Sequence, residues 1–221
     1  MEQVIAALSA GQDAAAGAPA AVSSLSGTAA ATPSAYSRTS PFRAEVLDNI
    51  NLNGRGSDRE TRHLALSLEG SQLQFEPGDC VGIYPENHPE LVDAIIAAMG
   101  WRADEPVPVG KQGEQRPLRD ALLQNYEITV LTKPLLEQAS AFTAHEGLRE
   151  LLLPDNAAAL KAYIQDRDLL DLVQDFSPWQ AGPAQFVSIL RKLPARLYSI
   201  ASSYKANPDE VHLTIRTVRY N

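Results

Sequence analysis

Alternating apolar and polar positions predict strands in the part of the chain that follows residue 40. Apolar residues occupy every second position from Phe42 to Val46, and the pattern resumes at Ile50 and Leu52. Turn-forming Asn, Gly, Asp and Pro residues separate the strand-like segments, which is typical of antiparallel strands joined by short loops. Two further strands of this kind are expected at 64–68 and 80–85.

The middle of the chain shows the three- and four-residue apolar spacing of helices. A helix is expected over 89–99, capped by Asn87 or His88 and stopped by Gly100. A longer helix, capped by Asp155, is expected to continue to Val173. Shorter helices are expected at 118–124, 135–143, 146–152 and 184–192, with one short strand at 127–131.

Strands return at the end of the chain, over 196–203 and 211–220. Strands, then helices, then strands indicate an α+β fold. We expect an antiparallel β-barrel that is interrupted by an inserted helical subdomain. The expected boundaries are a first barrel part at 41–86, a mostly helical part at 87–193 and a second barrel part at 194–221.

The first 40 residues have a different composition, because Ala, Ser, Thr, Gly and Pro account for 28 of them. Such a segment has little bulky apolar surface to offset the entropy lost on ordering. Residues 1–40 are therefore expected to be a disordered linker.

Charge and composition exclude several functional classes. The net charge of −8 disfavours nucleic-acid binding, which needs clustered cations. No apolar run is long enough to span a bilayer, and no basic, apolar leader is present, so no membrane association is expected. A single cysteine and four scattered histidines offer neither a disulfide nor a metal site. We expect a cytoplasmic protein without a metal, and Cys80 is expected to be buried.

One segment combines residues that suit a dinucleotide-like flavin. On a strand, Arg196 and Tyr198 share a face, so a guanidinium for a diphosphate lies near a ring that can stack on a heterocycle. Ser199 adds a hydroxyl, but strict alternation turns it to the opposite face unless the strand bends or ends there. An ordinary strand with an exposed arginine and a half-buried tyrosine remains the alternative.

The run Arg196-Leu197-Tyr198-Ser199, followed by 200–203, resembles the flavin motif of the ferredoxin–NADP reductase superfamily, and its longer form resembles the diflavin branch. The segments 77–87 and 214–220 are similar to other parts of that branch. The resemblance covers about 42–221 and is nearest to the sulfite reductase type. It implies a ferredoxin reductase-type FAD-binding barrel with an all-helical connecting subdomain.

The resemblance also implies roles for individual residues. Arg196 would bind the FAD diphosphate, and Tyr198, next to Leu197 in the motif, would lie against the flavin ring. Ser199 would act catalytically near the reactive ring nitrogen N5. The remaining implied cofactor residues are Thr214, Ile215 and Arg216 along the ring, Tyr220 near the adenine, and Thr132 in the helical part.

In this family, a flavodoxin-like FMN domain and an NADPH-binding domain normally flank the FAD-binding part, and neither is evident in this sequence. The resemblance therefore implies one module of an NADPH-dependent oxidoreductase, which passes electrons through FAD to FMN and has a sulfite reductase haemoprotein subunit as a further partner. The alternatives are the equivalent module of a cytochrome P450 reductase-like enzyme and a non-catalytic remnant. Because the phosphate-binding turn expected after Tyr220 is missing, weak FAD binding is expected.

Overall fold

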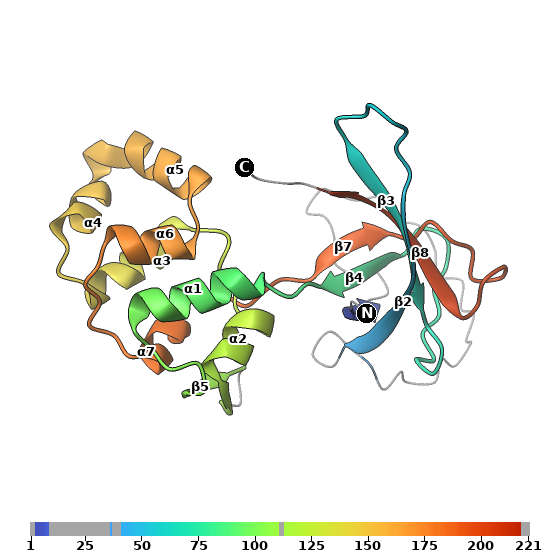
Figure 1. Cartoon of the computed structure of the whole chain (residues 1–221), viewed down its shortest axis with the longest axis horizontal. Coiled ribbons are helices and arrows are strands. Elements are labelled where there is room, and N and C mark those ends of the chain that lie inside the picture. The colour runs from blue at the N-terminus through green and yellow to red at the C-terminus, as the bar shows by residue number, and fades with distance from the viewer. Residues whose placement is uncertain (1–2, 9–35, 37–40, 111–112, 218–221) are drawn as a thin grey trace, which may run out of the picture. The chain divides into compact units, whose positions relative to one another are not determined.

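The computed structural model describes residues 3–8, 36, 41–110 and 113–217 (Figure 1). The chain divides into two compact units. The first comprises residues 1–85 and 195–221, and the second comprises residues 86–194. Two segments distant in sequence thus build the first unit, and the continuous middle of the chain builds the second.

The first unit is organised around a six-stranded antiparallel sheet with the strand order β7-β4-β1-β2-β3-β8. Its strands are β1 (Gln3–Leu8), β2 (Phe42–Asn51), β3 (Glu60–Ser67), β4 (Cys80–Tyr84), β7 (Arg196–Ser199) and β8 (Glu210–Thr217). The expected antiparallel strands on both sides of the helical region are therefore confirmed.

A closed barrel is not found among the described residues. The two end strands of the sheet, β7 and β8, are not joined by a ladder there, and their chains meet at one isolated bridge between Ile200 and Leu213. The sequence predicted strands from local alternation, whereas closure depends on long-range pairing that alternation does not encode.

The strand β1 corrects the expectation that residues 1–40 form a disordered linker. Gln3–Leu8 pairs with β2 on one side and with β4 on the other. A strand is held by backbone hydrogen bonds, so an Ala-rich composition does not preclude it when two neighbouring strands leave a gap. Residues 1–2, 9–35 and 37–40 lie outside the described part of the chain.

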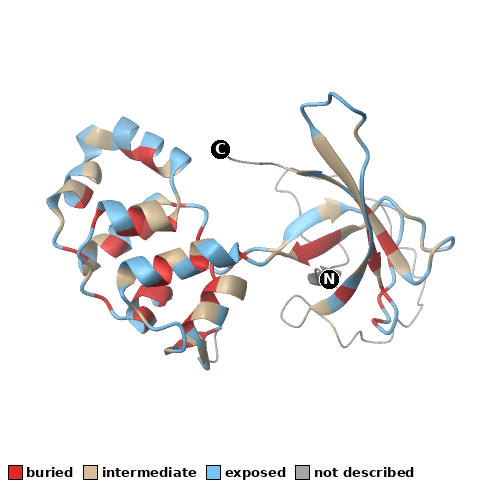
Figure 2. Ribbon diagram, in the orientation of Figure 1, coloured by how far each residue is buried: buried red, intermediate tan, exposed pale blue. Residues whose placement is uncertain are grey.

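One face of the sheet carries the core of the first unit. Leu66, Val211, Leu213 and Val81 are almost completely buried on this face (Figure 2). Across the β3–β8 ladder, Leu64 faces Leu213, and the alternating residues of both strands lie on the opposite face. We call this opposite side the outward face.

A bulge in β2 explains why the apolar pattern of that strand does not continue. Val46 pairs with Leu66, but Asp48 rather than Leu47 pairs with the next residue of β3. The extra residue reverses which side chains face the core. Ile50 is consequently 51% exposed, and the expectation that it resumes the buried pattern is wrong.

The second unit consists mainly of helices around its own core. They are α1 (Pro89–Met99), α2 (Leu118–Gln124), α3 (Lys133–Ala139), α4 (Glu146–Leu151), α5 (Ala157–Asp166), α6 (Leu169–Asp175) and α7 (Pro183–Ser188), with 3-10 turns at Ser140–Phe142 and Pro154–Asn156. The bounds expected for α1 and α2 are confirmed. Gly100 ends α1 with a φ of 65°, a conformation that favours glycine.

An aromatic cluster forms one part of this core. Phe186 is 1% exposed, and Trp101 and Trp179 contact it at ring-centroid distances of 5.4 and 5.5 Å. The Trp179 indole nitrogen also donates a 2.8 Å hydrogen bond to the Val173 carbonyl. Ring contacts between three separate segments therefore stabilise the packing of this unit.

Two features of the second unit differ from expectation. It is not all-helical, because β5 (Pro106–Val109) and β6 (Glu114–Pro117) form a two-stranded antiparallel sheet. Residues 127–131, where a strand was expected, form no strand in the described structure. The neighbouring Tyr126 forms an isolated bridge with Lys192. Pro106, Pro108 and Pro117 made the hairpin hard to predict, because proline is rare in strands.

The single long helix expected from Asp155 is instead two helices, α5 and α6. The break lies at Asp168, which caps α6 by accepting hydrogen bonds from the backbone nitrogens of Leu170 and Asp171. Asp171 returns a bond to the backbone nitrogen of Asp168, which completes a capping box. Burial raises the pKa of the Asp168 carboxyl above its ordinary value.

None of the helices in the described part of the chain is long and apolar enough to cross a bilayer.

Candidate flavin-binding face

The strand β7 carries the motif residues, and its pairing with β4 decides which way they point. Arg196 faces Ile83 and Tyr198 faces Val81, so both lie on the core side of the sheet. Leu197 and Ser199 alternate to the outward face. The strand ends at Ser199, and no bulge turns this residue back to the side of Tyr198.

The bridge beyond β7 brings this strand next to β8. Ile200 pairs with Leu213, and the backbone nitrogen of Ala201 donates a 2.8 Å hydrogen bond to the His212 carbonyl. Ser199 and Thr214 directly adjoin this bridge, and Leu197 and Arg216 lie on the same outward face of their strands, further from the bridge. These four residues, Leu197, Ser199, Thr214 and Arg216, are the centre of the candidate site.

All four residues are exposed. Leu197 is 66% exposed, the largest value among the exposed large apolar residues of the described chain. The Ser199 hydroxyl lies 4.0 Å from the Cys80 sulfur, and the Thr214 hydroxyl has no hydrogen-bond partner within the described residues. The face therefore offers an exposed apolar side chain on the same strand face as the Ser199 hydroxyl, together with a Thr214 hydroxyl that is available to a ligand.

Two arginines near this face carry charge that nothing in the described chain neutralises. Arg196 and Arg216 are exposed and form no ion pair within the described residues. By contrast, Arg62 pairs with Glu60 at 2.7 Å, and Arg119 pairs with Asp93 at 2.7 Å. Unpaired guanidinium groups are well suited to a diphosphate, which they can bind through two parallel hydrogen bonds.

The remaining motif residues of the first unit lie closer to the core. Tyr198 and Ile215 are half-buried and pack against the core cluster of the sheet. Part of the Tyr198 ring remains accessible, but it is on the side opposite Ser199. The structure thus distributes the expected flavin residues over both faces of the sheet.

Thr132 belongs to the second unit. It caps α3, where its hydroxyl accepts a 3.4 Å hydrogen bond from the Leu135 backbone nitrogen. It also lines a pocket of about 200 Å³ that contains the buried Glu127, which pairs with Arg191 at 3.6 Å. Tyr220, the other outlying candidate, lies outside the described residues.

Three residues of the outward face were not singled out from the sequence. His63 and His212 stack edge to face with ring centroids 5.0 Å apart, and His212 bonds Glu210. His212 alternates with apolar residues in the strand predicted at 211–220, whereas His63 precedes the strand predicted at 64–68 and had no such signal. Cys80 corrects another expectation, since it is only half-buried and lies beside Ser199 rather than in the core.

The donor set on this face fits a flavin dinucleotide. On the outward face, Arg216 matches a diphosphate, Leu197 offers an apolar surface for a flat ring, and Ser199 and Thr214 match polar atoms at a ring edge. Arg196, at the start of β7 on the core side of the sheet, is exposed and is a second candidate for the diphosphate. Metal binding has no comparable support, because no group of three or more His, Cys, Asp or Glu side chains in the described residues is arranged to hold an ion.

Comparison with known proteins agrees with this chemistry. Residues 34–221 match the family described as FAD binding domain. The sulfite reductase (NADPH) flavoprotein alpha-component of Bacillus subtilis (strain 168) is 64% identical over 188 residues, which are 85% of this chain and 31% of the relative. The protein of the same name from Serratia proteamaculans (strain 568) is 37% identical over the same shares.

The chain therefore spans about a third of the length of these relatives. The family match covers the whole candidate face, including β7, β8 and the unpaired arginines. Since the matched region makes up most of the chain, the chain belongs to the FAD-binding domain family.

Proposed function

We propose that the chain is the FAD-binding module of an NADPH-dependent diflavin oxidoreductase of the sulfite reductase type, which passes electrons from NADPH through FAD to FMN. The observation that carries this proposal is the set of exposed side chains on the outward face, within a region that matches FAD-binding domains: Leu197, Ser199, Thr214 and Arg216. The names of the matched relatives favour the sulfite reductase type over a cytochrome P450 reductase-like enzyme.

When bound, FAD supplies the redox chemistry by accepting two electrons as a hydride and releasing them singly. The protein binds and orients the cofactor. Arg196 and Arg216 hold the diphosphate, and Leu197 supports the ring through apolar contact. Ser199, with Thr214 beside it, hydrogen-bonds the ring edge near N5 and so stabilises charge that develops there. In the same proposal Tyr198 and Ile215 border the ring, while Tyr220 and Thr132 contact more distant parts of the cofactor.

The proposal extends to the architecture and the partners. The sheet of the first unit would form the FAD-binding barrel, and the second unit would be the connecting subdomain. A flavodoxin-like FMN domain, an NADPH-binding domain and a sulfite reductase haemoprotein subunit are the proposed partners. The names of the relatives, which mention NADPH and an alpha-component of sulfite reductase, support an NADPH-binding domain and a further subunit. A cytoplasmic location is proposed as well and is consistent with a single cysteine.

A negative charge introduced on the outward face tests the proposed site. Leu197→Asp places a carboxylate on an exposed position of the candidate face, where it repels the cofactor diphosphate and cannot support the ring. We expect the FAD dissociation constant, measured by quenching of flavin fluorescence, to rise at least tenfold, which corresponds to about 1.4 kcal/mol.

Leu153→Asp is the matched control, because Leu153 is 53% exposed and belongs to the second unit. Its FAD affinity should equal that of the unchanged protein. Equal affinities of the Leu197→Asp variant and the unchanged protein would refute the assignment of the outward face. An unchanged protein that binds no FAD at all would favour the non-catalytic alternative.

A further inference from the structure

We propose that His63 is a further cofactor-binding residue that hydrogen-bonds the flavin ring, and that His212 and Glu210 are positioning residues that fix its imidazole. This inference rests on the proposed function, because it extends the same outward face by one strand. Its ligand is the flat ring of the flavin rather than the diphosphate.

Strand register places His63 in line with the candidate site. His63 on β3 lies directly opposite Thr214 on β8, and Thr214 lies beside Ser199 on the chain of β7. The three side chains therefore form one row across three neighbouring strands. Two strand spacings, about 10 Å, separate the ends of this row, a distance that a tricyclic ring can span.

The ring nitrogens of His63 are available to a ligand. His63 is half-buried, its side chain forms no hydrogen bond or ion pair within the described residues, and its ring contacts the ring of His212. A neutral imidazole has one donor and one acceptor nitrogen, both of which suit the polar edge of a flavin. The site thus has an unused hydrogen-bonding group at the end opposite Ser199.

Neighbouring side chains hold the His63 ring in a defined orientation. The His212 ring meets it edge to face at an interplanar angle of 83°, and His212 Nε2 lies 2.8 Å from a Glu210 carboxylate oxygen. The carboxylate fixes the orientation of His212, and His212 in turn limits the rotation of His63. Other charged groups on this face are Arg216 of β8 and three residues of β2: Asp48, which pairs with Ala65, and Arg43 and Glu45 before the bulge.

A comparison of riboflavin with FAD distinguishes a contact of His63 with the flavin ring from a contact with phosphate. Riboflavin contains the ring but no phosphate, so its affinity should depend on His63 and not on Arg196. We expect His63→Leu to weaken the binding of both riboflavin and FAD three- to tenfold, which is typical of the loss of one hydrogen bond. His63→Gln keeps a donor and an acceptor and should recover most of the affinity, and Glu210→Ala should cause a smaller loss.

His88→Leu is the control, because His88 is exposed and makes no side-chain cap bond at the start of α1. Circular dichroism of each variant checks that it is folded. If His63→Leu does not fold, the comparison of His63→Gln with Glu210→Ala decides: retained riboflavin affinity in the first and reduced affinity in the second support the inference.

The outcomes distinguish this inference from the proposed function. If FAD binding depends on Leu197 and Arg196 but riboflavin affinity is the same with and without His63, only the role of His63 is overturned. A loss of FAD affinity without a loss of riboflavin affinity in His63→Leu also overturns it. If the unchanged protein binds neither ligand, the proposed function itself fails.

Discussion

Replacing Arg196 with alanine is expected to weaken FAD binding about ten- to a hundredfold. The reason is the loss of a charge-assisted contact to the cofactor diphosphate, which is worth about 1.5–3 kcal/mol. No carboxylate in the described chain pairs with Arg196, so the substitution leaves no unpaired charge behind and should not affect folding. Isothermal titration with FAD measures the effect.

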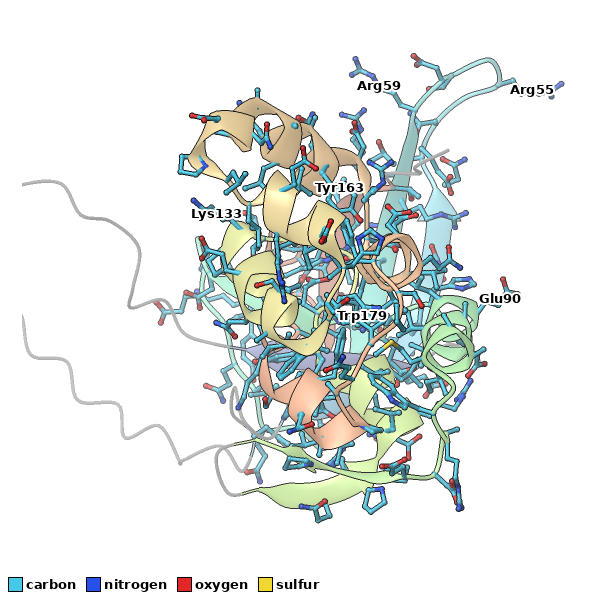
Figure 3. All side chains as sticks on the ribbon, turned by 90° about the vertical axis from the view of Figure 1, so that its left-hand side faces the viewer. Arg55, Arg59, Glu90, Lys133, Tyr163 and Trp179 are labelled. Atoms are coloured by element: carbon cyan, nitrogen blue, oxygen red, sulfur yellow. The ribbon has the colours of Figure 1, made fainter. Side chains whose placement is uncertain are left out.

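Two variants sharpen this prediction. Arg196→Lys keeps the charge but loses the planar fork of the guanidinium, and it should give an intermediate affinity. Arg55→Ala is the matched control, because Arg55 projects from the tip of the loop between β2 and β3 and forms no ion pair in the described residues (Figure 3). If the Arg196→Ala variant binds FAD as tightly as the Arg55→Ala variant, Arg196 does not bind the cofactor diphosphate.

Phe186→Ala is expected to destabilise the second unit by about 3–5 kcal/mol. The side chain is almost completely buried, and its removal leaves a cavity lined by rings that cannot collapse onto one another. Trp101 and Trp179 are the only tryptophans in the sequence, and both contact Phe186. Urea unfolding followed by tryptophan fluorescence therefore reports on this unit.

Leu153→Ala serves as the control for that experiment. Leu153 is 53% exposed, so its truncation should change the free energy of unfolding by no more than about 0.5 kcal/mol. A similar unfolding midpoint for the Phe186→Ala and Leu153→Ala variants would contradict the packing described for the core.

The elements that the sequence predicts best are those with strong local signals. Pro89 and Gly100 mark the two ends of α1, and the structure begins and ends the helix as expected. The break between α5 and α6 also has a local signal, the capping pair of Asp168 and Asp171, but apolar spacing continues across it and suggests one helix. The capping residues and the apolar spacing therefore predict different structures, and the structure follows the capping residues.

Features that depend on pairing between distant segments were not predictable in this way. The bulge at Leu47 leaves no trace in composition, yet it turns Ile50 outward. Alternation correctly indicated that Ser199 lies on the side opposite Tyr198, because it requires only the strand itself. Thr214 lies between Ser199 and His63, each on a neighbouring strand. This arrangement follows from the pairing of segments that are far apart in sequence.

Protection of Cys80 by the cofactor tests the central claim, that FAD binds on the outward face of β7 and β8. Cys80 is the single cysteine of the chain, it faces Ser199 across the β4–β7 ladder, and its sulfur lies 4.0 Å from the Ser199 hydroxyl. The labelling rate of Cys80 with a thiol reagent can be followed by mass spectrometry with and without saturating FAD. We expect FAD to slow the labelling, and Leu197→Asp to abolish this protection at the same FAD concentration. Equal labelling rates with and without saturating FAD would contradict FAD binding on the outward face.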